Sequence, residues 1–209
     1  MATEAVAAHR VPPLENGDTL SREEFERRWE SHPEIKKAEL IGGQVYLAMT
    51  DAVPHSEQQV DVTAWLGLYR SQYRAVQALD NVAVRLPEDD LRADAVLRRR
   101  EGGTSTASTA NRVEGPPELV FEISESSAAY DLHTKKAACE RGGILEYVVW
   151  QLYEDRLDWF RLEDGRYKTV EPGANGIIES TTFPGLRLDV PALLAGDLAR
   201  VLAALGQLR

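Results

Sequence analysis

Asp94, Glu122 and Lys135 have the types and surroundings expected of a metal-dependent site that cleaves phosphodiesters. Asp94 lies in the β-prone run 92–97 and Glu122 in the run 119–123, where apolar neighbours indicate burial. A buried carboxylate needs a partner, and two carboxylates brought together repel each other unless a cation lies between them. Bound Mg²⁺ or Mn²⁺ would remove that repulsion and supply hydrolytic chemistry.

Lys135 follows on the next predicted helix, where its ammonium could hold a phosphate or orient an attacking water. Both the lysine and the first acid also have simpler explanations. Asp131 and Lys135 are four residues apart, a spacing that commonly forms a surface ion pair on a helix. Asp94 could pair with Arg92 or Arg98 at the end of its strand. These alternatives remain open at the level of sequence.

Length and composition indicate one domain of ordinary globular character. The chain has 209 residues, 43% hydrophobic and 28% charged, and no apolar stretch approaches the roughly 20 residues needed to cross a bilayer. We therefore expect a flexible arm over residues 1–18, a single domain over residues 19–209, and no membrane partner. The start of the chain lacks the pattern of a secretory signal, which favours a cytoplasmic location.

The charge and the motifs exclude several classes of protein. A formal net charge of −10 argues against a protein that coats nucleic acid by bulk attraction, so a nucleic-acid partner must meet a local basic patch. The single cysteine, Cys139, excludes an internal disulfide and a cysteine-rich zinc site. Glycine-rich phosphate loops, Gly-x-Ser-x-Gly and His-Glu-x-x-His are absent, which argues against the commonest hydrolase and zinc-protease classes.

Periodicity and turn signals predict the elements that must position these residues. Helices are predicted from Ser21 to Ser31, after Pro54 with apolar positions through Tyr73, from Tyr130 to Arg141, and from Pro191 to the end. A hairpin is predicted over Ala38–Met49 around Gly42-Gly43, and strands over 76–86, 92–97, 118–124, 145–152, 156–162 and 167–170. The polar segment 101–117 is predicted to be a solvated loop or a substrate flap. This pattern predicts a mixed α/β sheet flanked by helices.

A set of short segments occurs in the order and spacing of a known family. The segments are Glu39–Val45 (ELIGGQV), His55, Pro117–Ser127 (PELVFEISESS), Tyr130-Asp131 with Lys135, Gly143–Tyr147 (GILEY) and Phe183–Leu186 (FPGL). Together they resemble the Uma-two family, once a domain of unknown function and described as putative restriction endonucleases. The resemblance covers most of the chain from about Leu20 onward.

The resemblance implies a restriction-endonuclease-like PD-(D/E)XK core with β-hairpin additions. In that superfamily one strand carries an Asp, and the next carries a Glu followed by a Lys. Ser124 stands where the lysine usually is, so the resemblance implies that the lysine has moved to the following helix as Lys135. The resemblance suggests Glu39 as a third metal ligand. A structural position beside the hairpin is an equally good explanation for this residue. Ala93 precedes Asp94 where the family usually has proline, which removes no ligand.

Three further residues are candidates for contacts with a substrate: His55, Ser124 and Lys136. His55 could contact a phosphate, or be a structural group near a helix N-terminus. Lys136 projects about 100° away from Lys135 around a helix, so only one of the two can face the site.

The activity expected from these observations is Mg²⁺- or Mn²⁺-dependent hydrolysis of nucleic-acid phosphodiesters, DNA foremost, without a nucleotide cofactor. The alternative is a non-catalytic module that binds nucleic acid or protein on the same fold. Net charge favours the module, whereas the acidic pair and the lysine favour the enzyme. Whether the chain forms a homodimer is left open.

Overall fold

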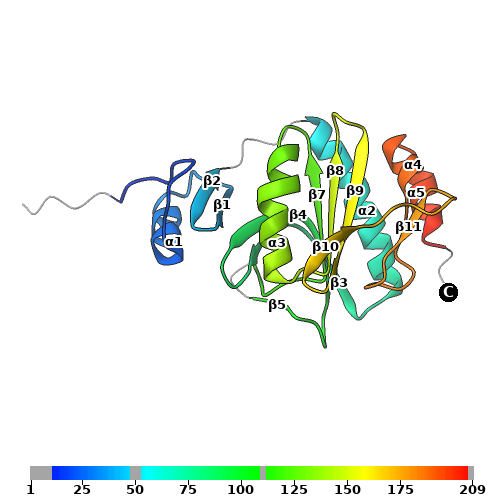
Figure 1. Ribbon diagram of the computed structural model, residues 1–209, viewed down its shortest axis with the longest axis horizontal. Coiled ribbons are helices and arrows are strands. Elements are labelled where there is room, and N and C mark those ends of the chain that lie inside the picture. Colours follow the sequence, from blue (N-terminus) through cyan, green and yellow to red (C-terminus); the bar gives the residue numbers. More distant parts are fainter. Residues whose placement is uncertain (1–10, 48–52, 109–111, 207–209) are drawn as a thin grey trace, which may run out of the picture.

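The computed structural model describes residues 11–47, 53–108 and 112–206 (Figure 1). The helices are α1 (Arg22–Ser31), α2 (Val53–Gln72), the π-helical turn η1 (Tyr130–Lys135), α3 (Lys136–Gly142), α4 (Val190–Leu194) and α5 (Leu198–Ala204). The strands are β1 (Ala38–Ile41), β2 (Gln44–Leu47), β3 (Val76–Arg85), β4 (Asp90–Arg99), β5 (Thr106–Ala107), β6 (Arg112–Glu114), β7 (Leu119–Ser124), β8 (Glu146–Gln151), β9 (Arg156–Glu163), β10 (Arg166–Thr169), β11 (Ile177–Glu179) and β12 (Arg187–Asp189). In these ranges, no helix combines the length and the apolar character that a membrane crossing needs.

A mixed sheet of ten strands, counted over the described ranges, forms the centre of the molecule. Its order is β10-β9-β8-β7-β4-β3-β6-β5, with β1 paired to β4 and β2 paired to β1. β7 and β8 are parallel, and η1 and α3 make the crossover that parallel neighbours require. β4 is antiparallel to β7. The strands that carry Asp94 and Glu122 are therefore neighbours in the middle of the sheet.

Helices cover both faces of the sheet (Figure 1). On one face α2, α4 and α5 enclose a core that includes Trp65 and Phe121. On the other face α3 covers a second core, which includes Val120 and Cys139. Since successive side chains of a strand alternate between faces, Glu122 shares the face of Val120, beneath η1 and α3.

α1, β1 and β2 form a small lobe at one end of the molecule, seen on the left in Figure 1. Leu14, Phe25 and Val45 are buried in its own apolar cluster. The Gly17 N–H donates to the Val45 carbonyl at 2.8 Å. Residues 11–18 of the expected N-terminal arm are thus packed on the hairpin, and residues 1–10 lie outside the described part.

Local sequence signals explain the first elements of the chain. Ser21 caps α1, because its side chain accepts a hydrogen bond from the Glu24 N–H at 3.2 Å. Gly42 and Gly43 have φ angles of 59° and 77°, as the tight turn between β1 and β2 requires. The predicted hairpin is confirmed up to Leu47, and its last two residues lie outside the described part.

α2 confirms the long amphipathic helix. Its predicted apolar positions Val62, Trp65, Leu66 and Tyr69 are all buried against the sheet. Tyr73 lies just beyond the helix, 42% exposed, and stacks on Tyr69 with ring centroids 4.6 Å apart. The periodicity of apolar residues therefore identified both the helix and the face that packs.

Three expectations are corrected. The helix from Tyr130 is not α-helical throughout, because its first six residues form η1. The segment 101–117 is not simply a loop, since β6 pairs in parallel with β3 and buries Val113. The C-terminal helix is two helices, each with its own aspartate cap, Asp189 and Asp197. The predicted strands correspond to β3, β4 and β7–β10, whereas β11 and β12 were not predicted.

Candidate active site

Asp94 and Glu122 face each other across neighbouring strands. The last pair in the β4–β7 ladder is Ala95 with Phe121, and Asp94 and Glu122 are the next residues of the two strands. The Ile123 N–H donates to Asp94 Oδ2 at 2.8 Å. This hydrogen bond fixes the aspartate carboxylate beside the strand that carries the glutamate.

The strand is irregular at Asp94. On the other side, Asn81 of β3 has a φ of 45°, and the pair between Asn81 and Asp94 is missing from the β3–β4 ladder. The Gln59 side chain of α2 donates instead to the Asp94 carbonyl at 2.9 Å. Arg92 Nη2 donates to the Asn81 carbonyl at 2.8 Å. Side-chain hydrogen bonds thus hold the backbone at a position where the ladder is interrupted. Irregular backbone of this kind often occurs at functional sites.

Lys135 brings its ammonium between two carboxylates. Nζ lies 3.0 Å from Glu39 Oε1 and 3.0 Å from Glu122 Oε2. It also donates to the Arg92 carbonyl at 2.6 Å, so all three N–H groups are engaged. The side chain is 5% exposed. A solvated surface pair with Asp131 therefore does not describe this lysine.

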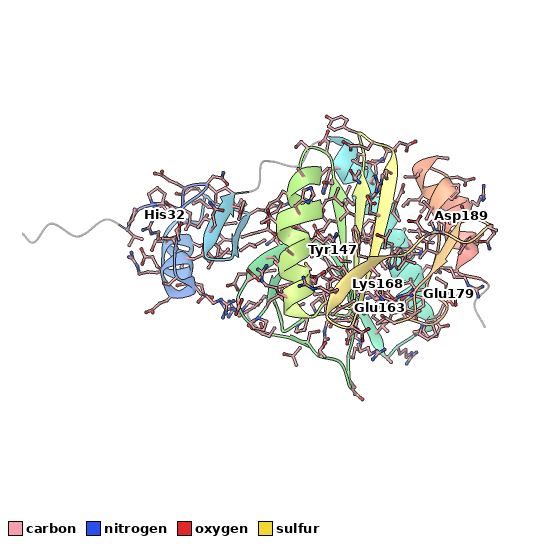
Figure 2. All side chains as sticks on the ribbon, in the orientation of Figure 1. His32, Tyr147, Glu163, Lys168, Glu179 and Asp189 are labelled. Atoms are coloured by element: carbon pink, nitrogen blue, oxygen red, sulfur yellow. The ribbon has the colours of Figure 1, made fainter. Side chains whose placement is uncertain are left out.

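The π-helical turn explains how Lys135 and Tyr130 reach the same carboxylate. In an α-helix, residues five apart project about 140° from each other, whereas the wider π turn brings them to one side. Tyr130 Oη donates to Glu39 Oε2 at 2.8 Å, whereas Lys135 contacts the other oxygen, Oε1. The turn is supported from the sheet by Tyr147, labelled in Figure 2, whose hydroxyl donates to the Asp131 carbonyl at 2.9 Å.

Glu39 links three elements. Its Oε1 accepts the Arg92 N–H at 2.7 Å as well as the lysine, and its Oε2 accepts the tyrosine hydroxyl. The side chain thereby joins β1 to β4 and to η1. These contacts occupy both oxygens of the carboxylate, so Glu39 is placed as an anchor for Lys135.

Burial and charge determine the protonation of the cluster. Burial raises the pKa of Glu122 well above its usual value, although the Lys135 charge opposes the shift. Burial lowers the pKa of Lys135, but Glu122 and Glu39 outweigh it and hold that pKa well above its usual value. Burial likewise raises the pKa of Asp94, but a hydrogen bond from His55 and the Lys135 charge bring it below normal. The lysine is therefore charged near neutral pH.

Most of these side chains line one cavity of about 470 Å³ between the β1–β2 hairpin, η1, the middle of β4 and the end of β7. Its walls include Glu39, His55, Asp94, Glu122 and Lys135. The structure thus brings together the three residues named first from the sequence, together with two of the additional candidates.

The other candidates occupy different positions. His55 Nε2 lies 3.2 Å from Asp94 Oδ2. Ser124 is buried below the cavity, where its hydroxyl donates to Asp131 Oδ2 at 2.7 Å. Lys136 Nζ lies 4.0 Å from the centre of the Phe160 ring, away from the cavity. Only one of the two adjacent lysines faces the site, as helical geometry requires.

Sequence reasoning missed the groups that hold Lys135 and Asp94 in place. The Arg92 carbonyl and the Ile123 N–H are backbone groups, which leave no signal in the side-chain pattern. Tyr130 does have a sequence signal, because it belongs to a segment of the family resemblance, but the sequence alone assigned it no role.

One atom indicates that the site fits a divalent cation. Glu122 Oε1 is buried and has no hydrogen-bond partner, while Oε2 contacts Lys135. An unpaired buried carboxylate oxygen is costly and calls for an explanation such as an ion. In the described part of the chain no three His, Cys, Asp or Glu side chains are grouped to hold a metal. Two carboxylates are nevertheless sufficient for Mg²⁺, which usually keeps several waters and contacts substrate phosphates.

The central mixed sheet, with two acids on adjacent strands and a lysine on the crossover helix, defines a restriction-endonuclease-like protein. The sequence model of the Uma2 family, described as "Putative restriction endonuclease", matches residues 22–191, and the chain belongs to that family. A similar solved structure is described as a putative nuclease belonging to DUF820 from Anabaena variabilis ATCC 29413. It has 13% sequence identity and a TM-score of 0.62, and the match covers 76% of this chain and 89% of that one. A search of curated proteins gave no significant match.

Proposed function

We propose that the protein is a divalent-metal-dependent endonuclease that hydrolyses phosphodiester bonds of nucleic acid, with DNA as its expected substrate. The observation that carries the proposal is Glu122, whose buried Oε1 has no partner although Asp94 and Lys135 line the same cavity. Leaving that oxygen buried without a partner is costly. The unused oxygen fits a cation that arrives with the substrate.

Asp94 and Glu122 would hold Mg²⁺ or Mn²⁺. When bound, such an ion polarises the phosphoryl oxygen and lowers the pKa of a coordinated water. Asp94 suits the role because its pKa lies below the usual value, so its carboxylate is ionised at neutral pH. His55, through its contact with Asp94 Oδ2, orients that carboxylate.

Lys135 would stabilise the negative charge that develops on the phosphoryl group, or orient the attacking water. It remains charged because the surrounding carboxylates raise its pKa. A fixed charge in a site with little water acts more strongly than it would in bulk solvent. Glu39 and Tyr130 are positioning residues here, since Glu39 holds the lysine and Tyr130 holds Glu39.

The rival function is a non-catalytic interaction module on the same fold. The observation that favours it is the net charge of −10, which weakens attraction for a polyanion. The two functions differ in whether a phosphodiester is broken, so a cleavage assay distinguishes them.

The test uses purified protein at low ionic strength with plasmid and oligonucleotide substrates, in Mn²⁺ or Mg²⁺ and in EDTA. We expect cleavage only with metal. Lys135→Ala should lose about a hundredfold or more in rate. Lys136→Ala is the matched control, because the adjacent amine lies against Phe160, and it should retain activity. Wild-type rates in Lys135→Ala would remove the lysine from the mechanism. No cleavage by the wild type of DNA or RNA, with either metal, would favour the interaction module.

A further inference from the structure

One wall of the cavity is aromatic, and the chemistry described above does not use it. It is formed by Tyr46 of β2, which pairs with Glu39 in the β1–β2 ladder. The Tyr46 ring packs against Tyr130, with centroids 4.8 Å apart and planes tilted by 42°. The Tyr46 hydroxyl donates to Gln44 Oε1 at 2.7 Å.

The acids and the lysine are recessed behind this wall. Glu122 is 2% exposed and Lys135 is 4% exposed. The cavity volume of about 470 Å³ is that of a site for a small ligand. A phosphodiester can reach these groups only by entering the cavity with its flanking nucleotide. An intact base pair is held at the centre of a stiff duplex and cannot follow it.

The charges of the cavity also disfavour a duplex. Its lining has more carboxylates than cations: Glu39, Asp94, Glu122, Glu125 and Asp131 against Lys37, Arg92 and Lys135. Tight binding of a duplex rests on many phosphates neutralised by lysine and arginine. A site with few cations gains affinity more readily from stacking a base on an aromatic ring, which is available only to an unpaired base.

We infer that the site takes single-stranded nucleic acid, with an unpaired base against Tyr46 and the adjacent phosphodiester at Asp94, Glu122 and Lys135. This inference rests on the proposed function, because it names the substrate of that same site. Tyr46 would determine the preference for single strands without taking part in bond cleavage.

Binding and cleavage are measured separately, so that the two ideas can fail independently. Fluorescence anisotropy compares a labelled single-stranded DNA oligonucleotide with a hairpin duplex of the same sequence, in buffer with Ca²⁺ and in EDTA. The single strand should bind the wild type more tightly. Tyr46→Ala should weaken its binding by roughly 5- to 150-fold, the equivalent of about 1–3 kcal/mol for one stacked base.

Matched variants separate stacking from folding. Tyr46→Phe keeps the ring and should bind within about twofold of the wild type, whereas Tyr46→Leu keeps apolar bulk but should behave like the alanine variant. Tyr73→Ala removes a tyrosine that stacks on Tyr69, outside the cavity lining, and should leave the dissociation constant unchanged. Melting temperatures verify that each variant is folded.

Each outcome decides something. Tighter binding of the hairpin duplex, or unchanged single-strand binding by Tyr46→Ala, overturns the inference. Cleavage of duplex but not of single strands in Mn²⁺ also overturns it, while the nuclease function stands. Tyr46-dependent binding of single strands without any cleavage contradicts the nuclease function and leaves the single-strand assignment in place. If neither probe binds, both are wrong.

Discussion

Two groups of charged residues in this protein differ in burial and in the balance of positive and negative charge. The lining of the candidate active site has five carboxylates (Glu39, Asp94, Glu122, Glu125 and Asp131) and three cations (Lys37, Arg92 and Lys135). In the second group, between α1 and the sheet, three acids (Glu26, Asp90 and Glu114) face three arginines (Arg22, Arg85 and Arg112). The first group has an excess of negative charge, whereas the second is neutral.

The second group also has its partners complete. Glu26 pairs with both Arg85 and Arg112, and Asp90 pairs with Arg85 and Arg22. Their side chains are partly exposed, with Glu26 at 35%. In the active-site group Lys135 and Glu122 are almost completely buried, and one oxygen of Glu122 has no partner. Ion pairing alone accounts for the second group but leaves the first incomplete.

Removing the lysine should have the largest effect on the fold. Lys135→Met leaves Glu39 and Glu122 buried without their cation, and breaking a buried pair in this way costs about 3–5 kcal/mol. Urea denaturation of wild type and variant at neutral pH measures the difference. Lys136→Met loses a contact with an aromatic ring and a charge near Glu140, and should cost no more than about 1 kcal/mol. Equal stabilities of Lys135→Met and wild type would mean that the buried carboxylates are not charged.

The same variant has a pH dependence with a definite sign. Burial raises the pKa of Glu122 in the folded protein, and Lys135 opposes that shift, so removing the lysine raises this pKa further. A carboxyl whose pKa is higher folded than unfolded binds more protons in the folded state, and stability then rises as pH falls. The stability deficit of Lys135→Met should therefore shrink as pH falls from the Glu122 pKa of the folded variant to the lower Glu122 pKa of the folded wild type. A deficit that stays constant over this interval contradicts the assignment.

The next largest effect is expected in the stabilisation of the fold by metal, which should depend on Glu122 but not on Glu39. Mg²⁺ or Mn²⁺ at a hundred times its dissociation constant should stabilise the wild type by about 2.7 kcal/mol and raise its melting temperature. Glu122→Gln should lose most of that rise, because it removes a proposed ligand. Glu39→Gln should keep it, because the Glu39 oxygens are used by Arg92, Lys135 and Tyr130. Loss of the rise in Glu39→Gln would make Glu39 the third ligand after all.

The smallest effect is expected in the second charged group. Glu26→Gln weakens two partly exposed ion pairs and should cost less than about 1 kcal/mol, without changing nuclease activity or the response to metal. Denaturation and cleavage assays on this variant measure both. A large loss of either property would mean that the α1 lobe contributes more to the site than Glu39 and Tyr46 alone.

The sequence predicted the central strands and the long helix because their signals are local. Alternating and periodic apolar residues identified β4, β7 and α2, and the interruption of such a run singled out Glu122. The family resemblance, rather than spacing, selected Lys135 over an ordinary surface pair. Local patterns of this kind determine the same strand or helix whatever distant segments pack against it. The structure accordingly confirmed these elements, and it brings the three residues into one cavity.

What the sequence did not predict depends on contacts between distant segments. A π turn differs from an α turn by one residue, which apolar periodicity over Tyr130–Lys135 cannot resolve. β6 is only three residues long and pairs at the edge of the sheet, so it has no strand pattern of its own. The position of Tyr46 in the cavity wall follows from how the β1–β2 hairpin docks on β4. These features arise only when the distant segments pack together.

The claim that one charged group binds a cation and the other is complete can be tested directly by crystallography with Mn²⁺, using its anomalous signal. We expect one ordered anomalous peak in contact with both Asp94 and Glu122 Oε1, with Lys135 retained on the other oxygen of Glu122. No peak is expected beside Glu26 or Asp90, where arginines occupy the carboxylates. A fully soaked crystal without a peak at Asp94 and Glu122, or with one only in the second group, would contradict the account.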